Sequence, residues 1–422
     1  MTADIELGRK KLDWARNHMP IHARLRAEHE AGQPLAGLRV AVCSHLEAKT
    51  GIFIETLAAL GGEVAFTGSE PMSTQDDVVA ALAEHDGIHA FARHGLDDAA
   101  FEAMQLDLLA LEPQLILDDA AELTARLVDD RPASLVHVLG VCEQTTTGVH
   151  RLQAMEREGR LGFPAYAVNE TPMKHFFDNV HGTGESALTN LALVTNLLIA
   201  GKTVVVAGYG YCGRGVAHKA RGWGANVIVT EVDPRRALQA HMEGLRVADM
   251  ATAAAEGDFF LTTTGNRDVI RGEHFAAMKD GAVLANAGHF NVEIRLADLE
   301  RKATTQREVR PGIVEYTLAD GRRINVVAEG RLVNLAAPTS MGHPAEVMDQ
   351  TFAMQIAAAL DLLGRRGDLA NTVYPVPDAV DQSVAELKLA SLGIAIDSMT
   401  PGQRAYLDAW RFEAIKDEGA PE

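Results

Sequence analysis

Cysteine is scarce in this sequence. Only Cys43, Cys142 and Cys212 occur among 422 residues, and they lie far apart. An odd number of widely separated cysteines gives neither a disulfide framework nor the paired spacing of a zinc site. We therefore expect a protein of the reducing cytoplasm that holds no metal.

Long apolar runs and clusters of positive charge are also missing. The longest apolar stretch, residues 191–200, is too short and too polar to span a bilayer, and the opening MTADIELGRKKLDW lacks the apolar core of an export signal. Acidic residues outnumber basic ones by 58 to 39, and the formal charge of −19 repels nucleic acid and anionic lipid. These absences predict a soluble protein that is not exported. They also favour a small molecule, rather than nucleic acid or a membrane, as its partner.

The sequence is rich in apolar residues, which alternate regularly with polar ones. Hydrophobic residues make up 47% of the chain, enough for two or three domains with large cores. Short apolar runs alternate with helix-like stretches over residues 37–140, and a second such series begins at Gly201. This alternation is typical of parallel sheets covered by helices on both faces. The sequence therefore predicts the α/β class, with two doubly wound parallel-sheet domains in succession.

Several local predictions follow from the same patterns. The apolar runs predict a strand over residues 135–141 and a helix over residues 52–62. The turn pair Asp320-Gly321, between two apolar runs, predicts a hairpin. The pattern from Pro344 to Leu363 is helical, and the joint between the domains is expected near residues 181–184.

A glycine-rich turn opens the second series. Gly208, Gly210 and Gly213 follow the apolar run TVVVA directly and begin the helix-like stretch RGVAHKARG. In this setting the first glycine permits a tight turn, the second lets a pyrophosphate approach the backbone, and the third lets helix and strand pack closely. Glu231, about 20 residues on, can accept hydrogen bonds from ribose hydroxyls, so the second domain is predicted to be a Rossmann domain that binds NAD. Arg236 could bind a 2′-phosphate, which keeps NADP as an alternative, and a purely structural turn is another.

Polar clusters follow several of the predicted strands. SHLEAKTG (residues 44–51), Asp118-Asp119 and residues 143–148 follow strands of the first series, and residues 286–290 end a strand of the second. In open α/β sheets the crevice at the carboxyl ends of the strands binds ligands. Each cluster alone could be a solvated turn. Together they predict one pocket, which His289 would face from the second domain.

A charged pair in K-H-F-F-D is a further candidate. Helical spacing stacks Lys174 over Asp178. An exposed ion pair is the simplest interpretation. The phenylalanines between them, Phe176 and Phe177, instead suggest a buried helix, where an ammonium and a carboxylate persist only if they are paired or used. We therefore favour a functional pair.

These residues lie within a set of ordered motifs that resembles the S-adenosylhomocysteine hydrolase family. The resembling blocks, in family order over most of the chain, are MSTQDDV, LILDDAAE, EQTTTGVHRL, KHFFDN, VVVAGYGYCGRGVA, VTEVDP, TTTGN, NAGHFNVEI, RLVNL and MGHP. The resemblance implies a substrate-binding domain of residues 1–182 with a returning segment over 346–390, an NAD domain of residues 186–343, and a C-terminal tail of residues 391–422. It also implies a homo-oligomer, a tetramer or a dimer.

By this resemblance the protein would cleave or form the 5′-thioether of a nucleoside such as S-adenosyl-L-homocysteine while keeping NAD tightly bound. Oxidation of the ribose 3′-hydroxyl makes the C4′ proton acidic, a base removes it, and the 5′-thiolate leaves. Water then adds at C5′ and the hydride returns. Lys174 and Asp178 would handle the 3′-hydroxyl proton and the ribose. His45 and Asp119 would serve the acid–base steps near C4′ and C5′, and His289 would bind the sugar.

The resemblance also assigns residues to the two ligands. Thr50 and Gln144 are placed at the substrate, and Met341 and His343 would close over the base. The cofactor residues that it adds to the glycine turn and Glu231 are Thr145, Thr146, Thr147, Asn179, Tyr211, Cys212, Thr264, Asn266, Gly288 and Asn334.

The sequence departs from the family pattern at the base. Where the family has H-M-T-x-E/Q-T, this chain has H-L-E-A-K-T, so Lys49 places an ammonium donor where the family accepts from the adenine amino group. A 6-oxopurine would suit Lys49, and Glu47 could accept from its ring N–H. The alternative is that Glu47 and Lys49 pair with each other or face solvent. Gln144 replaces a family glutamate at the sugar, and the family's aromatic C-terminus has no clear match in residues 411–422.

Three functional hypotheses follow. The leading one is the NAD-dependent thioether hydrolase, acting on an adenosine derivative or, as a divergent paralogue, on another nucleoside or another 5′-leaving group. The second is a catalytically silent homologue that binds NAD and a nucleotide as a regulatory subunit. The third is an ordinary nicotinamide dehydrogenase with two α/β domains.

Overall fold

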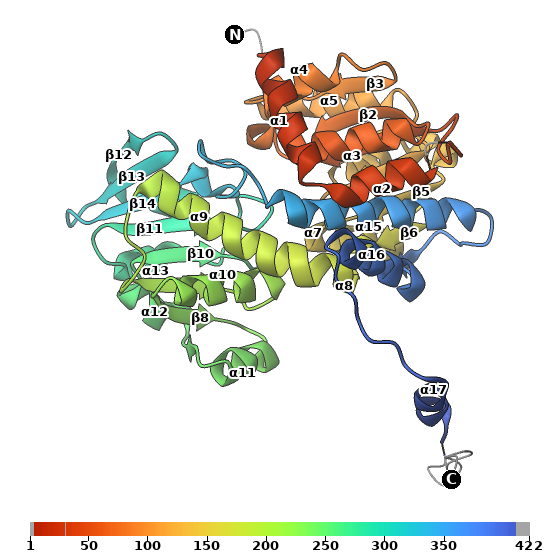
Figure 1. The fold of residues 1–422 in the computed structure, drawn as a ribbon. Helices are drawn as coiled ribbons and strands as arrows, with labels where there is room; N and C mark the ends of the chain where they lie inside the picture. Colours follow the sequence, from red (N-terminus) through yellow and green to blue (C-terminus); the bar gives the residue numbers. More distant parts are fainter. Residues whose placement is uncertain (1–3, 30, 411–422) are drawn as a thin grey trace, which may run out of the picture.

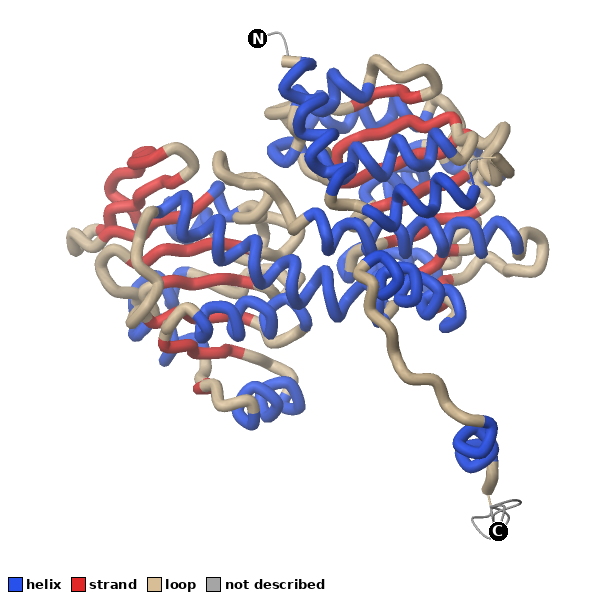
Figure 2. The backbone as a smooth tube through the Cα atoms, in the orientation of Figure 1, coloured by secondary structure: helices blue, strands red, loops and turns tan. Residues whose placement is uncertain are grey.

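The computed structural model describes residues 4–29 and 31–410. Two bodies, each built on one sheet, lie side by side, with helices α9 (Thr183–Thr195) and α15 (Ala345–Gly364) running where they meet (Figure 1). Helices lie on either side of the strands in both bodies (Figure 2). This architecture confirms the predicted α/β class with two largely parallel sheets.

The first sheet has seven parallel strands in the order β15-β6-β5-β4-β1-β2-β3. They are β1 (Arg39–Ser44), β2 (Glu63–Gly68), β3 (Ile88–Phe91), β4 (Leu115–Asp118), β5 (Gly140–Glu143), β6 (Ala165–Ala167) and β15 (Val373–Pro375). The α-helices around this sheet, besides α15, are α1 (Ile5–Asn17), α2 (Pro20–His29), α3 (Ala48–Ala59), α4 (Asp76–Leu82), α5 (Asp98–Leu109), α6 (Glu122–Asp130), α7 (Thr146–Arg157) and α16 (Asp378–Ser391). The central strands β4 and β5 are buried along their whole length, as expected for a parallel sheet covered on both faces.

The second sheet has eight strands in the order β12-β13-β14-β11-β10-β7-β8-β9. They are β7 (Thr203–Ala207), β8 (Asn226–Thr230), β9 (Arg246–Val247), β10 (Phe259–Thr262), β11 (Ala282–Asn286), β12 (Ala303–Arg310), β13 (Ile313–Leu318) and β14 (Arg323–Val327). Its α-helices, besides α9, are α10 (Tyr211–Gly222), α11 (Pro234–Met242), α12 (Met250–Glu256), α13 (Gly272–Ala277) and α14 (Leu296–Lys302). Strand β13 runs antiparallel to both neighbours, which confirms the hairpin predicted at Asp320-Gly321.

Both sheets reverse their strand order at the centre. In the first sheet β1 lies between β2 and β4, and in the second β7 lies between β8 and β10. Parallel sheets open a crevice at the carboxyl ends of the strands at such a reversal. The residues directly after β1 and β4 are His45 and Asp119, and those after β7 and β10 are Gly208 and Thr263. The predicted polar clusters therefore begin where each sheet can hold a ligand.

The chain crosses between the two bodies through an interrupted helix. The short α8 (Pro172–Lys174) continues into a π-helix (His175–Gly182) and then into α9. Such π-helical turns are rare and occur frequently at functional sites. The chain returns through α15, whose Phe352 stacks on Phe53 of α3 with ring centroids 4.6 Å apart. The helix predicted after Pro344 is thus confirmed, and it packs into the core of the first body.

Two local predictions were wrong. Helix α3 begins at Ala48 rather than at residue 52, because the Glu47 side chain caps it by accepting from the Lys49 backbone N–H at 3.0 Å. The strand predicted over residues 135–141 begins only at Gly140. A 3₁₀ helix (Pro132–His137) precedes it, and Val136 is 81% exposed rather than buried.

The chain past α16 leaves both bodies and ends in the separate helix α17 (Pro401–Asp408) (Figure 1). Residues 411–422, where the family's aromatic C-terminus has no clear match, lie outside the described residues. Within residues 4–29 and 31–410, no helix is long and apolar enough to cross a bilayer.

A close contact between α10 and the interrupted helix gives a test of the packing. A Cβ atom on Gly215 would collide with the backbone carbonyl of Val180, whereas one on Gly222 of the same helix would meet nothing within 4 Å. We expect Gly215→Ala to lower the free energy of unfolding by about 1–3 kcal/mol, because the added methyl group must separate the two helices. Gly222→Ala is the matched control and should not lower it. Denaturant unfolding followed by circular dichroism measures both, and equal effects would contradict the close approach.

Candidate functional site

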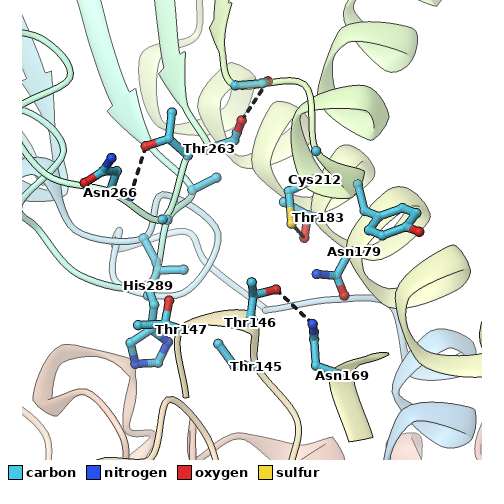
Figure 3. Close-up of a pocket in the computed structure, with 18 of the residues that line it drawn as sticks. Thr145, Thr146, Thr147, Asn169, Asn179, Thr183, Cys212, Thr263, Asn266 and His289 are labelled. Atoms are coloured by element: carbon cyan, nitrogen blue, oxygen red, sulfur yellow. Dashed lines mark hydrogen bonds between the residues drawn. The ribbon is translucent and has the colours of Figure 1, made fainter. Parts of the chain in front are cut away.

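A cavity of about 810 Å³ lies between the two bodies and is lined by residues from both. Thr146 and Asn169 of the first body and Cys212 and Thr263 of the second surround one part of it (Figure 3). All the predicted site residues line this cavity except Lys49, Gly213 and Met341. Residues from distant parts of the chain are thus brought together in one site.

The glycine turn after β7 has the geometry of a dinucleotide cradle. Gly208 has φ +93°, and a Cβ on Gly213 would collide with the carbonyl oxygen of Gly208. This packing role explains why Gly213 does not itself line the cavity. A Cβ on Gly210, by contrast, would meet only the Arg236 side chain within 4 Å, so the backbone there is open to a ligand. The cradle opens α10, whose N-terminal N–H groups favour an anion.

The acid after β8 and the loop after β10 complete this half of the site. Glu231 Oε2 accepts from the Tyr209 N–H at 2.7 Å, which holds the carboxylate against the glycine turn. Buried Glu293 accepts from the N–H and the hydroxyl of Thr264 at 2.9 and 2.7 Å and thereby fixes the loop that carries Asn266. Burial raises the pKa of the Glu293 carboxyl. Glu293 was not predicted as a site residue, and the only signal for it in the sequence is its place in the block NAGHFNVEI.

The Lys174 ammonium is buried among oxygen atoms. Its Nζ donates to Asn179 Oδ1 at 2.7 Å and to Asn169 Oδ1 at 3.0 Å, and it lies 3.3 Å from Asp178 Oδ1. Asn169 was not predicted as a site residue, and it also donates from Nδ2 to Thr146 Oγ1 at 2.8 Å. Several polar groups therefore fix the position of a single ammonium.

The two phenylalanines between Lys174 and Asp178, predicted to lie in a buried helix, are exposed. Phe176 and Phe177 are 48% and 37% exposed, whereas Lys174 and Asp178 are 4% and 6% exposed. Residues four apart share one face of a helical segment, while those between them point elsewhere. The charged face is therefore the buried one.

Side chains from three segments lie around the Asp178 carboxylate. Lys174 lies on one side of it, His343 Nδ1 lies 3.4 Å from Oδ1, and Thr351 of α15 donates to Oδ2 at 3.0 Å. Burial alone would raise the pKa of the Asp178 carboxyl, but Lys174 and His343 outweigh it and hold the pKa well below its usual value. The carboxylate stays ionised and can accept hydrogen bonds from hydroxyl groups.

Two histidines flank a second carboxylate. His45 Nε2 lies 3.4 Å from Asp119 Oδ2, and His289 Nδ1 lies 3.8 Å from Asp119 Oδ1. Ser73 Oγ lies 2.7 Å from His45 Nδ1 and orients that ring. The donor atoms of these three residues lie within 4.8 Å of one another, a spacing that could also hold a metal ion.

Burial and charge set the protonation of this group. Burial lowers the pKa of His45 to about 4, so its imidazole is neutral at pH 7 and can take a proton. Burial would raise the pKa of Asp119, but His289, His45 and the hydrogen bond from Thr145 outweigh it and lower the pKa below its usual value. A neutral base thus lies beside an ionised acceptor.

Glu143, which the sequence placed in a polar cluster at the pocket but gave no role of its own, holds the loop under Asp119. Its carboxyl oxygens accept from the N–H groups of Ala120, Ala121 and Thr145 at 2.9, 2.8 and 2.7 Å. Both alanines have positive φ, +66° and +52°, a conformation that costs about 1–2 kcal/mol per non-glycine residue. These hydrogen bonds offset the strain and so fix the backbone that presents Asp119.

Glu47 and Lys49 pair with each other, one of the two alternatives expected from the sequence. Lys49 Nζ lies 2.6 Å from Glu47 Oε2 and donates to the Met341 carbonyl oxygen at 2.5 Å. Glu47 lines the cavity, whereas Lys49 is buried behind it. The Met341 side chain is 71% exposed, so its backbone rather than its side chain takes part. Gly342 and His343 line the cavity in its place.

Three buried side-chain atoms around the cavity have no hydrogen-bond partner among the described residues. They are Gln144 Oε1, Asn334 Oδ1 and His289 Nε2. Buried polar atoms are nearly always hydrogen-bonded, so unpaired ones in a cavity indicate a polar ligand. Such a ligand would find two hydrogen-bond acceptors, the amide oxygens, and one histidine ring nitrogen.

Comparison with known proteins identifies relatives over nearly the whole chain. A family model described as S-adenosyl-L-homocysteine hydrolase matches residues 2–134, and one described as the NAD binding domain of that hydrolase matches residues 179–340. The S-inosyl-L-homocysteine hydrolase of Methanosarcina acetivorans is 52% identical over 406 residues, covering 96% of this chain and 98% of the relative. The adenosylhomocysteinase of Halobacterium salinarum is 54% identical over 406 residues, covering 96% of this chain and 95% of the relative.

The protonation of His45 can be measured directly. We expect its ring to titrate near pH 4 rather than near its ordinary 6.5, because burial disfavours the imidazolium. The unfolded chain would bind that proton first, so this histidine makes stability fall as the pH falls from about 6.5 to 4. Histidine-labelled NMR spectra, with His45→Asn identifying the signal, give the midpoint. A midpoint at or above 6.5 would contradict the neutral base.

Proposed function

The chain belongs to the S-adenosyl-L-homocysteine hydrolase family, and from that premise we propose that it cleaves, or forms in reverse, the 5′-thioether of a purine nucleoside. The observation that carries the proposal is one cavity with two proton-handling groups. Lys174 and Asp178 form one, and His45, Asp119 and His289 form the other. The reaction needs two such groups, because it moves protons at a ribose hydroxyl and at a neighbouring carbon.

The family's cofactor is NAD, and the residues present fit it. The glycine turn, Glu231 and the loop of Thr264 and Asn266 would hold its adenosine and pyrophosphate parts, and Thr146 and Asn179 its nicotinamide end. When bound, NAD supplies the chemistry of removing a hydride from the ribose and returning it. Glu231 lies where a 2′-phosphate would be repelled, which supports NAD over NADP.

The protein's own residues would then move the protons. Lys174, after losing one ammonium proton to water, would take the proton of the 3′-hydroxyl as a neutral amine among its cluster of oxygens, and ionised Asp178 would hold the ribose through a hydroxyl. Once C3′ is a ketone, neutral His45 would remove the C4′ proton, with Asp119 stabilising the charge that it gains. The thiolate leaves C5′ with the bonding electron pair, and a water molecule adds there. His289 would hold the sugar.

The two kinds of relative differ in the purine nucleoside that their names give, inosine in one and adenosine in the other. For this chain, Glu47 and Lys49 support the 6-oxopurine. Glu47 Oε2 is taken up by Lys49, but Glu47 lines the cavity and can accept from a ring N–H with its other oxygen. Lys49 lies behind Glu47 rather than on the cavity wall, and its Nζ uses two of its three N–H groups on Glu47 and Met341, so the third would donate to the carbonyl of a base that sits against Glu47. Adenine presents an amino donor at that position and would leave this third N–H of Lys49 without an acceptor.

Two further expectations stay proposals. We propose a homo-oligomer, a tetramer or a dimer, which the exposed leucines Leu193, Leu197 and Leu198 support at 52%, 50% and 72% exposure. We also propose a cytoplasmic location. The alternatives of a silent homologue and of an ordinary dehydrogenase receive no support from relatives that are named as hydrolases.

The reaction itself is tested with purified protein, S-inosyl- and S-adenosylhomocysteine, and the corresponding nucleosides. We expect free thiol to appear and bound NADH to absorb transiently in the near ultraviolet. Lys174→Met should reduce both by about 10²- to 10⁴-fold, because it removes the proton acceptor for the oxidation. Lys202→Met, at an exposed lysine, is the control and should change neither. No thiol and no NADH from any of these compounds would contradict the proposal.

The choice of base is tested by the ratio of kcat/KM for the inosyl and adenosyl substrates. The natural protein should prefer the inosyl compound, and Lys49→Gln should shift the ratio toward adenosyl by about 10- to 100-fold, because an amide can accept from the amino group. Lys219→Gln, which loses an exposed lysine paired with Glu185, should leave the ratio unchanged. A ratio that Lys49→Gln does not alter would show that Lys49 only pairs with Glu47.

A further inference from the structure

The segment from Glu231 to Glu243, which contains α11, lies at the periphery of the second body (Figure 1). Glu231, Val232 and Arg236 of this segment line the cavity beside the glycine turn. A Cβ on Gly210 would come within 3.6 Å of Arg236 Nη1, so the segment closely approaches the turn. Whatever holds this segment in place therefore determines the shape of the cofactor half of the site.

Tyr209, the residue between the first two glycines of the turn, is hydrogen-bonded to both ends of this segment. Its backbone N–H donates to Glu231 Oε2 at 2.7 Å, and its phenol O–H donates to Glu243 Oε2 at 2.7 Å. Tyr209 is 2% exposed and belongs to the same hydrophobic core as Ala240 of α11. One tyrosine thus closes a loop of chain that begins after β8 and ends after α11.

The Glu243 carboxylate is surrounded by hydrogen-bond donors. His218 Nε2 of α10 lies 2.6 Å from its Oε2, and Gln239 Nε2 of α11 donates to its Oε1 at 2.9 Å. Burial would raise the pKa of Glu243, but its donors, Tyr209 first among them, outweigh burial and lower the pKa to about 2. Burial and the adjacent carboxylate raise the pKa of the Tyr209 phenol. The phenol therefore stays a donor and the carboxylate an ionised acceptor, a combination that makes a strong hydrogen bond.

We infer that Tyr209 and Glu243 are positioning residues for the cofactor, because together they hold the segment around α11 against the glycine turn. Neither is among the described residues that line the cavity, so both act through those that do. Glu231 would accept from the adenosine ribose of NAD, and a displaced segment would loosen that contact. The hydrogen bond therefore slows the dissociation of NAD. This inference rests on NAD as the cofactor and is independent of which thioether the protein cleaves.

The test follows the dissociation of radiolabelled NAD from the intact protein into an excess of unlabelled NAD. Tyr209→Phe should speed dissociation about 10-fold, because it removes a hydrogen bond to a charged group and keeps the ring in the core. Tyr166→Phe is the matched control, since Tyr166 is buried in the first body and donates to Asp361 Oδ2 at 2.6 Å. It should lower the free energy of unfolding to a similar extent and leave NAD dissociation unchanged.

Glu243→Gln tests the same contact from the other side and should also speed NAD dissociation. The double variant should show less than the product of the two single effects, because both substitutions break one hydrogen bond. If Tyr209→Phe fails to fold, Glu243→Gln alone decides, by the same comparison with Tyr166→Phe.

Three results would overturn the inference. They are release of NAD at the natural rate from either single variant, a full product of effects in the double variant, and equal acceleration by Tyr166→Phe, which general destabilisation would explain. The assay contains no nucleoside, so a failure of the proposed reaction would leave its outcome unaffected.

Discussion

The structure depends on one topological constraint, the reversal of strand order at the centre of both parallel sheets. Each reversal opens a crevice at the carboxyl ends of the strands, and the interrupted helix and α15 hold the two crevices against a common cavity. His45 and Asp119 follow neighbouring strands of one sheet, and Gly208 and Thr263 follow neighbouring strands of the other. The site is therefore a consequence of strand order before any individual side chain is considered.

Within that cavity, burial determines what each charge can do. An ammonium taken out of water persists only where oxygen atoms replace its hydration, and Lys174 has them from Asn169, Asp178 and Asn179. His45 is also removed from water, but its surroundings stabilise an imidazolium less than water does, so its ring stays neutral. Burial therefore leaves Lys174 charged, because oxygen atoms surround it, and His45 uncharged. A reaction that both gives and takes protons needs one group that is protonated and another that is not.

Much of this site could be predicted from the sequence because its signals are local. A glycine turn after a strand and polar residues at strand ends have a meaning that a few neighbouring residues determine. The contact between Lys49 and the Met341 carbonyl joins residues 292 positions apart, so no local pattern carries it. The role of Glu143 was not predicted for a similar reason, because this residue holds the backbone of another loop. Phe176 and Phe177 were wrongly predicted to be buried, because neighbouring residues of a helix lie on different faces. Exposed aromatic residues can therefore lie beside a buried ion pair.

The central claim is that this cavity oxidises C3′ so that His45 and Asp119 can remove the proton from C4′. The most direct measurement is hydrogen exchange at C4′ of a nucleoside incubated with the protein in D₂O, without thiol, and analysed by NMR and mass spectrometry. The account predicts that one deuterium enters at C4′, with none at C1′ or C2′, and that Lys174→Met abolishes its entry. Formation of bound NADH with no deuterium at C4′ would contradict the account, because C3′ would then be oxidised without a base acting on the neighbouring carbon.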